Sequence, residues 1–310
     1  MKVAVTGADG FVGRRLVATL VERGHSVTAG VRPPGESAWT PPRTVQVVPL
    51  EITDDGSVMK FVRMGADAVV HLAAVASGAD ARRDPGYAWT VNAAGTARLA
   101  EHLAGQLGDG SGPLLLLVST AEVYGTATTP RVETDPVAPV SPYAASKLAA
   151  ELATLEVHRR TGLRVVIARA FPHSGPGQDE RFVLPAFVRR LALAKRMGAP
   201  VVKVGNLDVV REFLHVADVV EAYVALLERG TAGTLYNVSR GEGVVLADVF
   251  ERLTRLIGHA AIPETDPALM RRADIRYLVG DRARLESAVG WRPRISLDQL
   301  LQELVDAETH

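Results

Sequence analysis

Cysteine is absent from the 310 residues, which excludes disulfide bonds and thiolate chemistry. Excess charge of either sign is also absent, because 35 acidic residues balance 35 basic ones, so nothing favours binding to nucleic acid or to an anionic membrane. The longest strongly apolar run, residues 114–118, is too short to cross a bilayer and predicts a buried parallel strand. With no secretory leader visible, we expect a cytoplasmic protein with a core large enough for two lobes.

Lysine is scarce, with only five among the 35 basic residues. One of them, Lys147, follows Tyr143 by four positions in a segment that starts at Pro142 and predicts a helix. Positions four apart share a helix face, so the ammonium would lie beside the phenol and lower its pKa. Such a tyrosine could transfer a proton at neutral pH. The alternative is a pair of ordinary surface residues.

The start of the chain has the pattern of a dinucleotide site. Residues 2–6 form a short apolar strand, a G-x-x-G-x-x-G turn follows at Gly7, Gly10 and Gly13, and residues 14–22 predict a helix. Glycines let the backbone approach a pyrophosphate, and the helix N-terminus offers N–H groups without partners. The alternative is a tight turn that needs only positive φ angles.

The choice of cofactor depends on the end of the second predicted strand, residues 25–30. An NAD site usually has an acidic residue about 20 positions after the glycines, but here Val31 and Arg32 follow that strand. A guanidinium suits the 2′-phosphate of NADP, so we predict NADPH, with NADH possible. If Arg32 is only a solvated loop residue, both cofactors would bind.

Strands alternate with helices along the first half of the chain. Further strands are predicted at 45–50, 68–72, 114–119 and 164–169, with helices at 87–107 and after Tyr143. This order predicts an α/β fold with a doubly wound parallel sheet. After Phe171 the chain is richer in proline and glycine and its elements are shorter. We therefore expect a domain at 1–170, joined by a returning segment near 212–238, and a smaller α/β substrate lobe within 171–310.

Five motifs in order and spacing resemble those of the extended short-chain dehydrogenase/reductases, the nucleotide-sugar epimerase/dehydratase-like enzymes. They are the glycine turn from Thr6, His71-Leu72-Ala73-Ala74, Val118-Ser119-Thr120, Val123-Tyr124-Gly125 and Tyr143-x-x-x-Lys147. The resemblance implies a Rossmann fold for the first domain, a helix-bundle homodimer and a catalytic triad of Thr120, Tyr143 and Lys147.

Each member of this triad has an expected role. Thr120 would donate a hydrogen bond to a substrate carbonyl, unless it only caps the end of a strand. Tyr143 would give its proton to the carbonyl oxygen, and Lys147 would lower the tyrosine pKa and bind the nicotinamide ribose. His71 is expected to end a strand rather than to act in catalysis. The resemblance implies a cofactor site made of Gly7, Asp9, Gly10, Phe11, Val12, Gly13, Arg32, Glu51, Ile52, Leu72, Ala73, Ala74, Tyr143 and Lys147.

The residues after Thr120 bear on the reaction. Sugar-nucleotide 4,6-dehydratases of the dTDP-glucose type have Thr-Asp-Glu, whose aspartate protonates the leaving hydroxyl. This chain has Ala121 and then Glu122, so half of that acid/base pair is missing and dehydration is disfavoured. GDP-mannose 4,6-dehydratases also lack the aspartate, so dehydration stays an alternative. Glu122 is a further catalytic candidate that would orient the sugar, or it is merely solvated.

The second half resembles the reductases of GDP-6-deoxy-4-keto-mannose, most clearly in the run from Arg169 to Gln178. Such enzymes reduce the C4 ketone of a nucleotide-linked 6-deoxyhexose. Arg211 would pair with the diphosphate, and Arg272 is a second candidate, although either could form an interlobe ion pair instead. The implied substrate site consists of Ser77, Thr120, His173, Val183, Asn206, Arg211 and Arg272.

One position departs from that pattern, because Pro172 replaces an asparagine of the run and has neither a side-chain donor nor an N–H. The substrate could therefore be a ketone on a natural-product scaffold. A nucleotide-sugar 4-epimerase is another alternative. A regulator that binds NADP without turnover is the alternative of a different class, but such proteins typically lose the tyrosine or the lysine.

Overall fold

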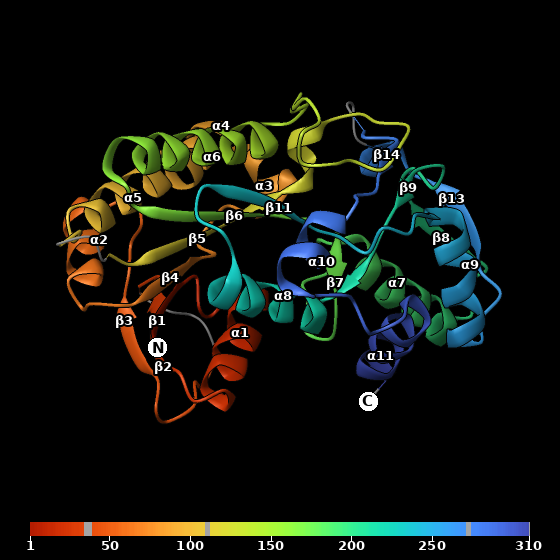
Figure 1. Cartoon of the computed structure of the whole chain (residues 1–310). Coiled ribbons are helices and arrows are strands. Elements are labelled where there is room, and N and C mark those ends of the chain that lie inside the picture. The colour runs from red at the N-terminus through yellow and green to blue at the C-terminus, as the bar shows by residue number, and fades with distance from the viewer. Residues whose placement is uncertain (34–38, 109–111, 271–273, 310) are drawn as a thin grey trace.

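The central element of the computed structural model is a seven-stranded, fully parallel sheet (Figure 1). The structure describes residues 1–33, 39–108, 112–270 and 274–309. Along the sheet the strands are β11 (Thr234–Val238), β6 (Arg164–Ala170), β5 (Leu114–Thr120), β4 (Ala68–His71), β1 (Lys2–Thr6), β2 (Ser26–Val31) and β3 (Gln46–Pro49). The predicted doubly wound α/β architecture is therefore confirmed.

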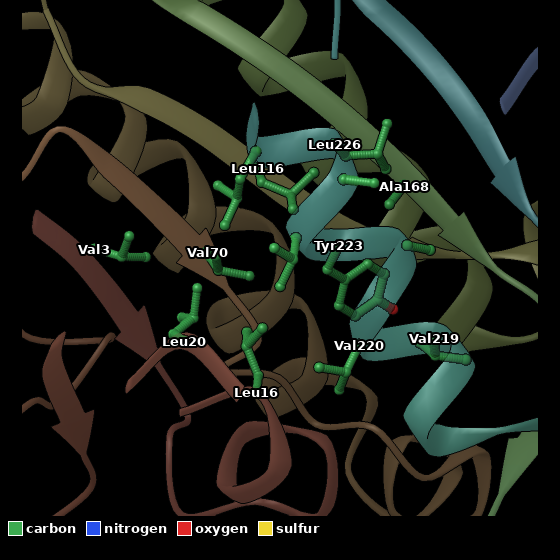
Figure 2. Packing of buried hydrophobic residues seen from close by; sticks show 14 of the residues in the cluster. Val3, Leu16, Leu20, Val70, Leu116, Ala168, Val219, Val220, Tyr223 and Leu226 are labelled. Carbon is green, nitrogen blue, oxygen red and sulfur yellow. The ribbon is translucent and has the colours of Figure 1, made fainter. Parts of the chain in front are cut away.

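Helices cover both faces of this sheet. One face packs on α1 (Phe11–Glu22), α8 (Val216–Arg229) and α10 (Ala283–Val289), and the other on α2 (Asp55–Val62), α5 (Thr96–Ala104) and α6 (Pro142–Thr161). Leu116 belongs to the first core, shown in Figure 2, whereas Leu115 and Leu117 belong to the second. Side chains alternate along a strand, so burial of both sets explains why residues 114–118 form an unbroken apolar run.

The helix expected at 87–107 is interrupted. It consists of α4 (Pro85–Trp89), a π-helical segment (Thr90–Gly95) and α5, after the short α3 (Gly78–Arg83). The side chain of Asn92 binds away from the helix: it accepts from Val75 N at 2.8 Å and donates to Ser146 Oγ at 3.0 Å. A π-helical turn is a frequent device at functional sites, and no sequence periodicity indicates it.

The smaller lobe contains three short sheets around a separate core. Its helices are α7 (Val183–Met197), α9 (Leu246–Ile257) and α11 (Leu297–Thr309). Its strand pairs are β7 (His173–Ser174) with β10 (Leu214–His215), β8 (Val201–Val204) with β13 (Ile262–Thr265), and β9 (Val210–Arg211) with both β12 (Val244–Val245) and β14 (Tyr277–Leu278). Two short 3₁₀ helices, Ala121–Tyr124 and Pro267–Leu269, complete the described elements.

A buried carboxylate fixes the strand that carries Arg211. Glu212 accepts hydrogen bonds from the backbone N–H groups of Arg240, Gly241 and Gly280, at 2.7, 3.1 and 3.0 Å. Burial nevertheless raises the pKa of Glu212 to about 7. These contacts hold β9 against the segments that follow β11 and β14, which places Arg211 firmly. Within the described segments, no helix combines the length and the apolarity that crossing a bilayer requires.

Candidate active site

The turn after β1 needs its glycines because backbone atoms surround them. Gly7 has a φ of +65°, and a Cβ added to it would lie 2.9 Å from Ala73 N. A Cβ on Gly13 would lie 2.3 Å from Gly7 O. No side chain caps α1 at Gly10, so the first N–H groups of this helix face the turn. These residues fit a dinucleotide pyrophosphate, which needs close backbone approach and free N–H groups.

A hydrogen-bonded chain connects this turn to the π-helical segment. Leu72 N and Ala73 N donate to Thr6 Oγ1 at 3.2 and 3.1 Å, and Thr6 Oγ1 lies 2.7 Å from His71 Nδ1. On the other side, His71 Nε2 lies 2.9 Å from Thr96 Oγ1. Burial lowers the pKa of His71 to about 3, so the ring is neutral.

The hydrogen-bond donors and acceptors around His71 determine its tautomer. Thr96 gives its hydroxyl proton to Asn92 O at 2.6 Å, so it accepts from Nε2–H, and Nδ1 accepts from Thr6. His71 ends β4 as expected. It also ties the backbone beside the glycine turn to the helix on the opposite face, a role that its position in the sequence does not reveal.

The other predicted cofactor residues lie around the same edge of the sheet, past the carboxyl ends of β1, β2 and β3. Arg32 follows β2 and is exposed. Glu51 accepts from Thr53 N at 3.0 Å and from Thr53 Oγ1 at 2.7 Å, and Ile52 packs on Gly95. Ligands of doubly wound sheets bind at this edge. Of the remaining candidates, Asp9 lies within the turn, Phe11 and Val12 begin α1, and Leu72, Ala73 and Ala74 follow β4.

Two of the three predicted catalytic residues come together directly. Thr120 ends β5, Tyr143 lies in the first turn of α6, and the Thr120 hydroxyl is close enough to the phenol to act on its pKa. Ser141 caps α6 by accepting from Ala144 N at 3.1 Å, which sets where this helix begins. Lys147 lies one turn further along α6 and is buried. The sheet edge and the cap therefore position the pair.

The expectation of a lowered pKa for Tyr143 is wrong for this structure. Burial raises the pKa of Tyr143, the negative charge of Glu122 raises it further, and the nearby Thr120 hydroxyl opposes them. The desolvation of the phenolate exceeds the effect of a cation one turn away. Tyr143 therefore keeps its proton at neutral pH, as a proton donor must.

A buried ion pair lies one turn beyond Lys147 on α6. Arg169 Nη2 donates to Glu151 Oε2 at 2.7 Å and Nε donates to Oε1 at 3.0 Å, and Ser119 Oγ also donates to Oε1. The guanidinium lies 4.6 Å from the ring centroid of Tyr124. Because Ser119 immediately precedes Thr120, this pair anchors the end of β5 to the catalytic helix. The sequence analysis missed Glu151, although its position four residues after Lys147 places it on the same face.

The residues predicted to bind substrate lie in two separate regions. A cleft between the lobes is lined by Arg82, Glu122, Val140, Ser141, Arg211, Ile275 and Leu278. Arg211 Nη2 donates to Asp274 Oδ1 at 3.0 Å, and Asn206 Nδ2 lies 3.4 Å from Asp274 Oδ2. This ion pair lies within the smaller lobe, not between the lobes. Sequence reasoning missed Arg82 and Asp274, which no motif marks.

The other substrate candidates lie elsewhere. His173 stacks on Phe11 with ring centroids 6.5 Å apart and binds Phe171 O through Nδ1 at 2.9 Å, so it adjoins the glycine turn. Ser77 caps α3 by accepting from Ala79 N and Asp80 N at 3.2 and 3.3 Å. Val183 begins α7. Arg272 lies outside the described residues.

The buried ammonium group of Lys147 is expected to make the catalytic rate depend on pH. Burial lowers its pKa to about 8, against the opposing effect of Glu151. Its positive charge is lost as pH rises through that value, so kcat/KM is expected to decline above about pH 8. A pH profile with saturating cofactor measures this. In Lys147→Arg, which stays charged, the decline should move to higher pH; an unchanged decline would show that another group titrates.

Comparisons with known proteins agree with this geometry. Residues 3–239 match the NAD dependent epimerase/dehydratase family. The chain is 35% identical over 308 residues to GDP-6-deoxy-D-mannose reductase of Pseudomonas aeruginosa, covering 98% of this chain and 96% of that protein. The structure of RMD from Pseudomonas aeruginosa complexed with NADPH has a TM-score of 0.83 and 33% identity, covering 99% of this chain and 98% of that chain. UDP-glucose 4-epimerase of Thermus thermophilus in complex with NAD has a TM-score of 0.88 and 30% identity, covering 100% and 99%.

Proposed function

Because the chain belongs to the NAD dependent epimerase/dehydratase family, we propose that it uses NADPH to reduce the C4 ketone of a nucleotide-activated 4-keto-6-deoxyhexose. It is an NAD(P)-dependent oxidoreductase of the extended short-chain dehydrogenase/reductase type. The observation that carries the proposal is Tyr143, a protonated phenol next to the Thr120 hydroxyl and beside a small cleft lined by Arg211. A protonated tyrosine suits reduction, in which the carbonyl oxygen must receive a proton.

The proposed roles follow from the geometry. NADPH, when bound, supplies the hydride to the carbonyl carbon. Thr120 holds the carbonyl oxygen with a hydrogen bond, and Tyr143 gives that oxygen its phenolic proton, so that the ketone becomes an alcohol. Lys147 places a positive charge on the same helix face and favours the phenolate that results. The glycine turn and the first turn of α1 hold the cofactor pyrophosphate.

Related reactions serve as alternatives. A 4-epimerase would use the same tyrosine and lysine, and a 4,6-dehydratase of the dTDP-glucose type would need an acid where this chain has Ala121. Pro172 leaves open a ketone on a natural-product scaffold, because the ring offers no donor to a phosphate. Retention of both Tyr143 and Lys147 argues against a regulator that binds NADP without turnover.

The test of the function is NADPH oxidation. The protein would be mixed with NADPH and, in turn, GDP- and dTDP-linked 4-keto-6-deoxyhexoses, and the product's C4 configuration would be read by NMR. We expect turnover of at least one of them. Turnover of a ketone on an unphosphorylated scaffold, with none of any nucleotide sugar, would reject the proposal in favour of that alternative.

Cofactor preference gives a second expected result. We propose that Arg32, exposed after β2, binds the 2′-phosphate, so NADPH should bind more tightly than NADH. Arg32→Ala should weaken NADPH binding by about 1–3 kcal/mol, the scale of a hydrogen bond to a charged group, and leave NADH unchanged. Isothermal titration with both cofactors measures this. Equal affinities in the unaltered protein would remove Arg32 from the site.

We also propose that each lobe binds a different ligand. Residues 1–170 with the returning segment near 212–238 would bind NADP, since α8 and β11 from that segment belong to the layers of the large sheet. The rest of 171–310 would bind substrate. Since the reaction consumes NADPH, a reductant of the cytoplasm, we place the enzyme there.

Exposed apolar side chains on adjacent helices support a homodimer. Trp89 on α4 and Leu152 on α6 are 45% and 60% exposed, and these helices pack against each other. We propose that a second copy covers this face. Leu152→Glu should then convert a dimer to a monomer in sedimentation velocity, whereas Leu193→Glu, on the exposed face of α7 in the other lobe, should not. A monomeric unaltered protein would contradict the proposal.

A further inference from the structure

Arg82 is a cleft residue that none of the motifs above includes. It lies near the end of α3, in the Rossmann lobe, and it lines the interlobe cleft together with Arg211 from β9 of the smaller lobe. Glu122 is the one acidic residue among the side chains that line this cleft. The cleft therefore carries a cation from each lobe, and its acid is the residue that acts electrostatically on Tyr143.

The neighbours of Arg82 are held by other contacts. Asp80 pairs with Arg83 at 3.2 Å and also with Arg181 from the loop before α7, so α3 is tied to the smaller lobe. Arg82 itself has no hydrogen bond or ion pair within the described ranges. Its Nη1 lies 3.5 Å from the position that a Cβ on Gly78 would take, so the guanidinium folds back over the start of α3.

We propose that Arg82 and Arg211 bind the diphosphate of a nucleotide-linked substrate from opposite sides of this cleft. The inference rests on the proposed function only in taking the substrate to be nucleotide-linked. A guanidinium presents planar paired donors that match phosphate oxygens, and two such groups match the charge of a diphosphate. Arg211 is already oriented by Asp274, whereas no salt bridge to Arg82 is found among the residues that the structure describes.

Glu122 would determine how the bound substrate is oriented in the cleft. Its carboxylate repels phosphate, and it lies close enough to Tyr143 to raise the pKa of that phenol. The diphosphate is therefore held on the arginine side of the cleft, and the sugar is directed toward Thr120 and Tyr143.

Binding of nucleoside diphosphates tests the assignment without any turnover. Isothermal titration with GDP, dTDP and UDP, and with the matching monophosphates, would be done with the cofactor site saturated by NADP⁺. We expect Arg82→Ala to weaken the best diphosphate by about 10- to 100-fold, the value of a hydrogen bond to a charged group. The monophosphate should lose less, and Arg82→Lys should recover part of the affinity.

Arg83→Ala is the matched control, because Arg83 is adjacent, 81% exposed and paired with Asp80. It should change the dissociation constant by less than about twofold, the scale of a surface ion pair. An equal loss in Arg83→Ala, an unchanged affinity in Arg82→Ala, or no binding of any diphosphate to the unaltered protein would each overturn the inference. Failure of the proposed reduction alone would leave the binding result intact, so the two proposals are distinguishable.

Discussion

Replacement of Tyr143 by phenylalanine is expected to slow hydride transfer by about 10²- to 10⁴-fold, the usual contribution of general acid–base catalysis. The substitution keeps the ring and removes only the hydroxyl beside Thr120. Single-turnover oxidation of bound NADPH by the true substrate measures the effect. The NADPH dissociation constant should hardly change, because the glycine turn and α1 hold the pyrophosphate.

Tyr87→Phe is the control for this substitution. Tyr87 is 41% exposed on α4, so loss of its hydroxyl should leave the rate unchanged. Nearly full activity in Tyr143→Phe would show that the proton comes from another donor and that the catalytic assignment is wrong. The raised pKa of Tyr143 also means that its ionisation does not limit the rate near neutral pH, so the decline above about pH 8 is expected from Lys147.

Removal of one partner of the buried pair is expected to have the largest effect on stability. Glu151 and Arg169 are almost fully buried and joined by three hydrogen bonds. Glu151→Leu should lower the free energy of unfolding by about 3–5 kcal/mol, because Arg169 would remain charged in an apolar environment. Denaturant unfolding monitored by tryptophan fluorescence measures the change.

The double variant Glu151→Leu/Arg169→Met separates the two possible causes. If an uncompensated buried charge is responsible, the double variant should be more stable than either single variant. Glu156→Leu on the exposed side of α6, which removes one of the two carboxylate partners of Arg160, should leave the denaturation midpoint nearly unchanged. A double variant less stable than both single variants would show that packing, not charge, accounts for the loss.

Features set by local sequence could be predicted, and those set by distant contacts could not. The glycine turn, the strand at 114–120 and the start of α6 at Pro142 each depend on a few adjacent residues, and all appear as expected. The rise in the Tyr143 pKa depends on its burial and on Glu122, which approaches it only in the folded chain. Arg82 and Arg211 are more than a hundred residues apart, so the sequence alone does not indicate that they line the same cleft.

The position of β11 affects how the protein folds during its synthesis. This strand completes one edge of the large sheet, and Tyr223 and Leu226 of α8 belong to the same core as Leu16 and Leu20 of α1 (Figure 2). A growing chain that has emerged from the ribosome only as far as β6 therefore has an unpaired sheet edge and an uncovered α1. The large sheet therefore cannot close during synthesis until most of the second half of the chain has been translated, so a break in the chain near residue 171 would leave the sheet incomplete.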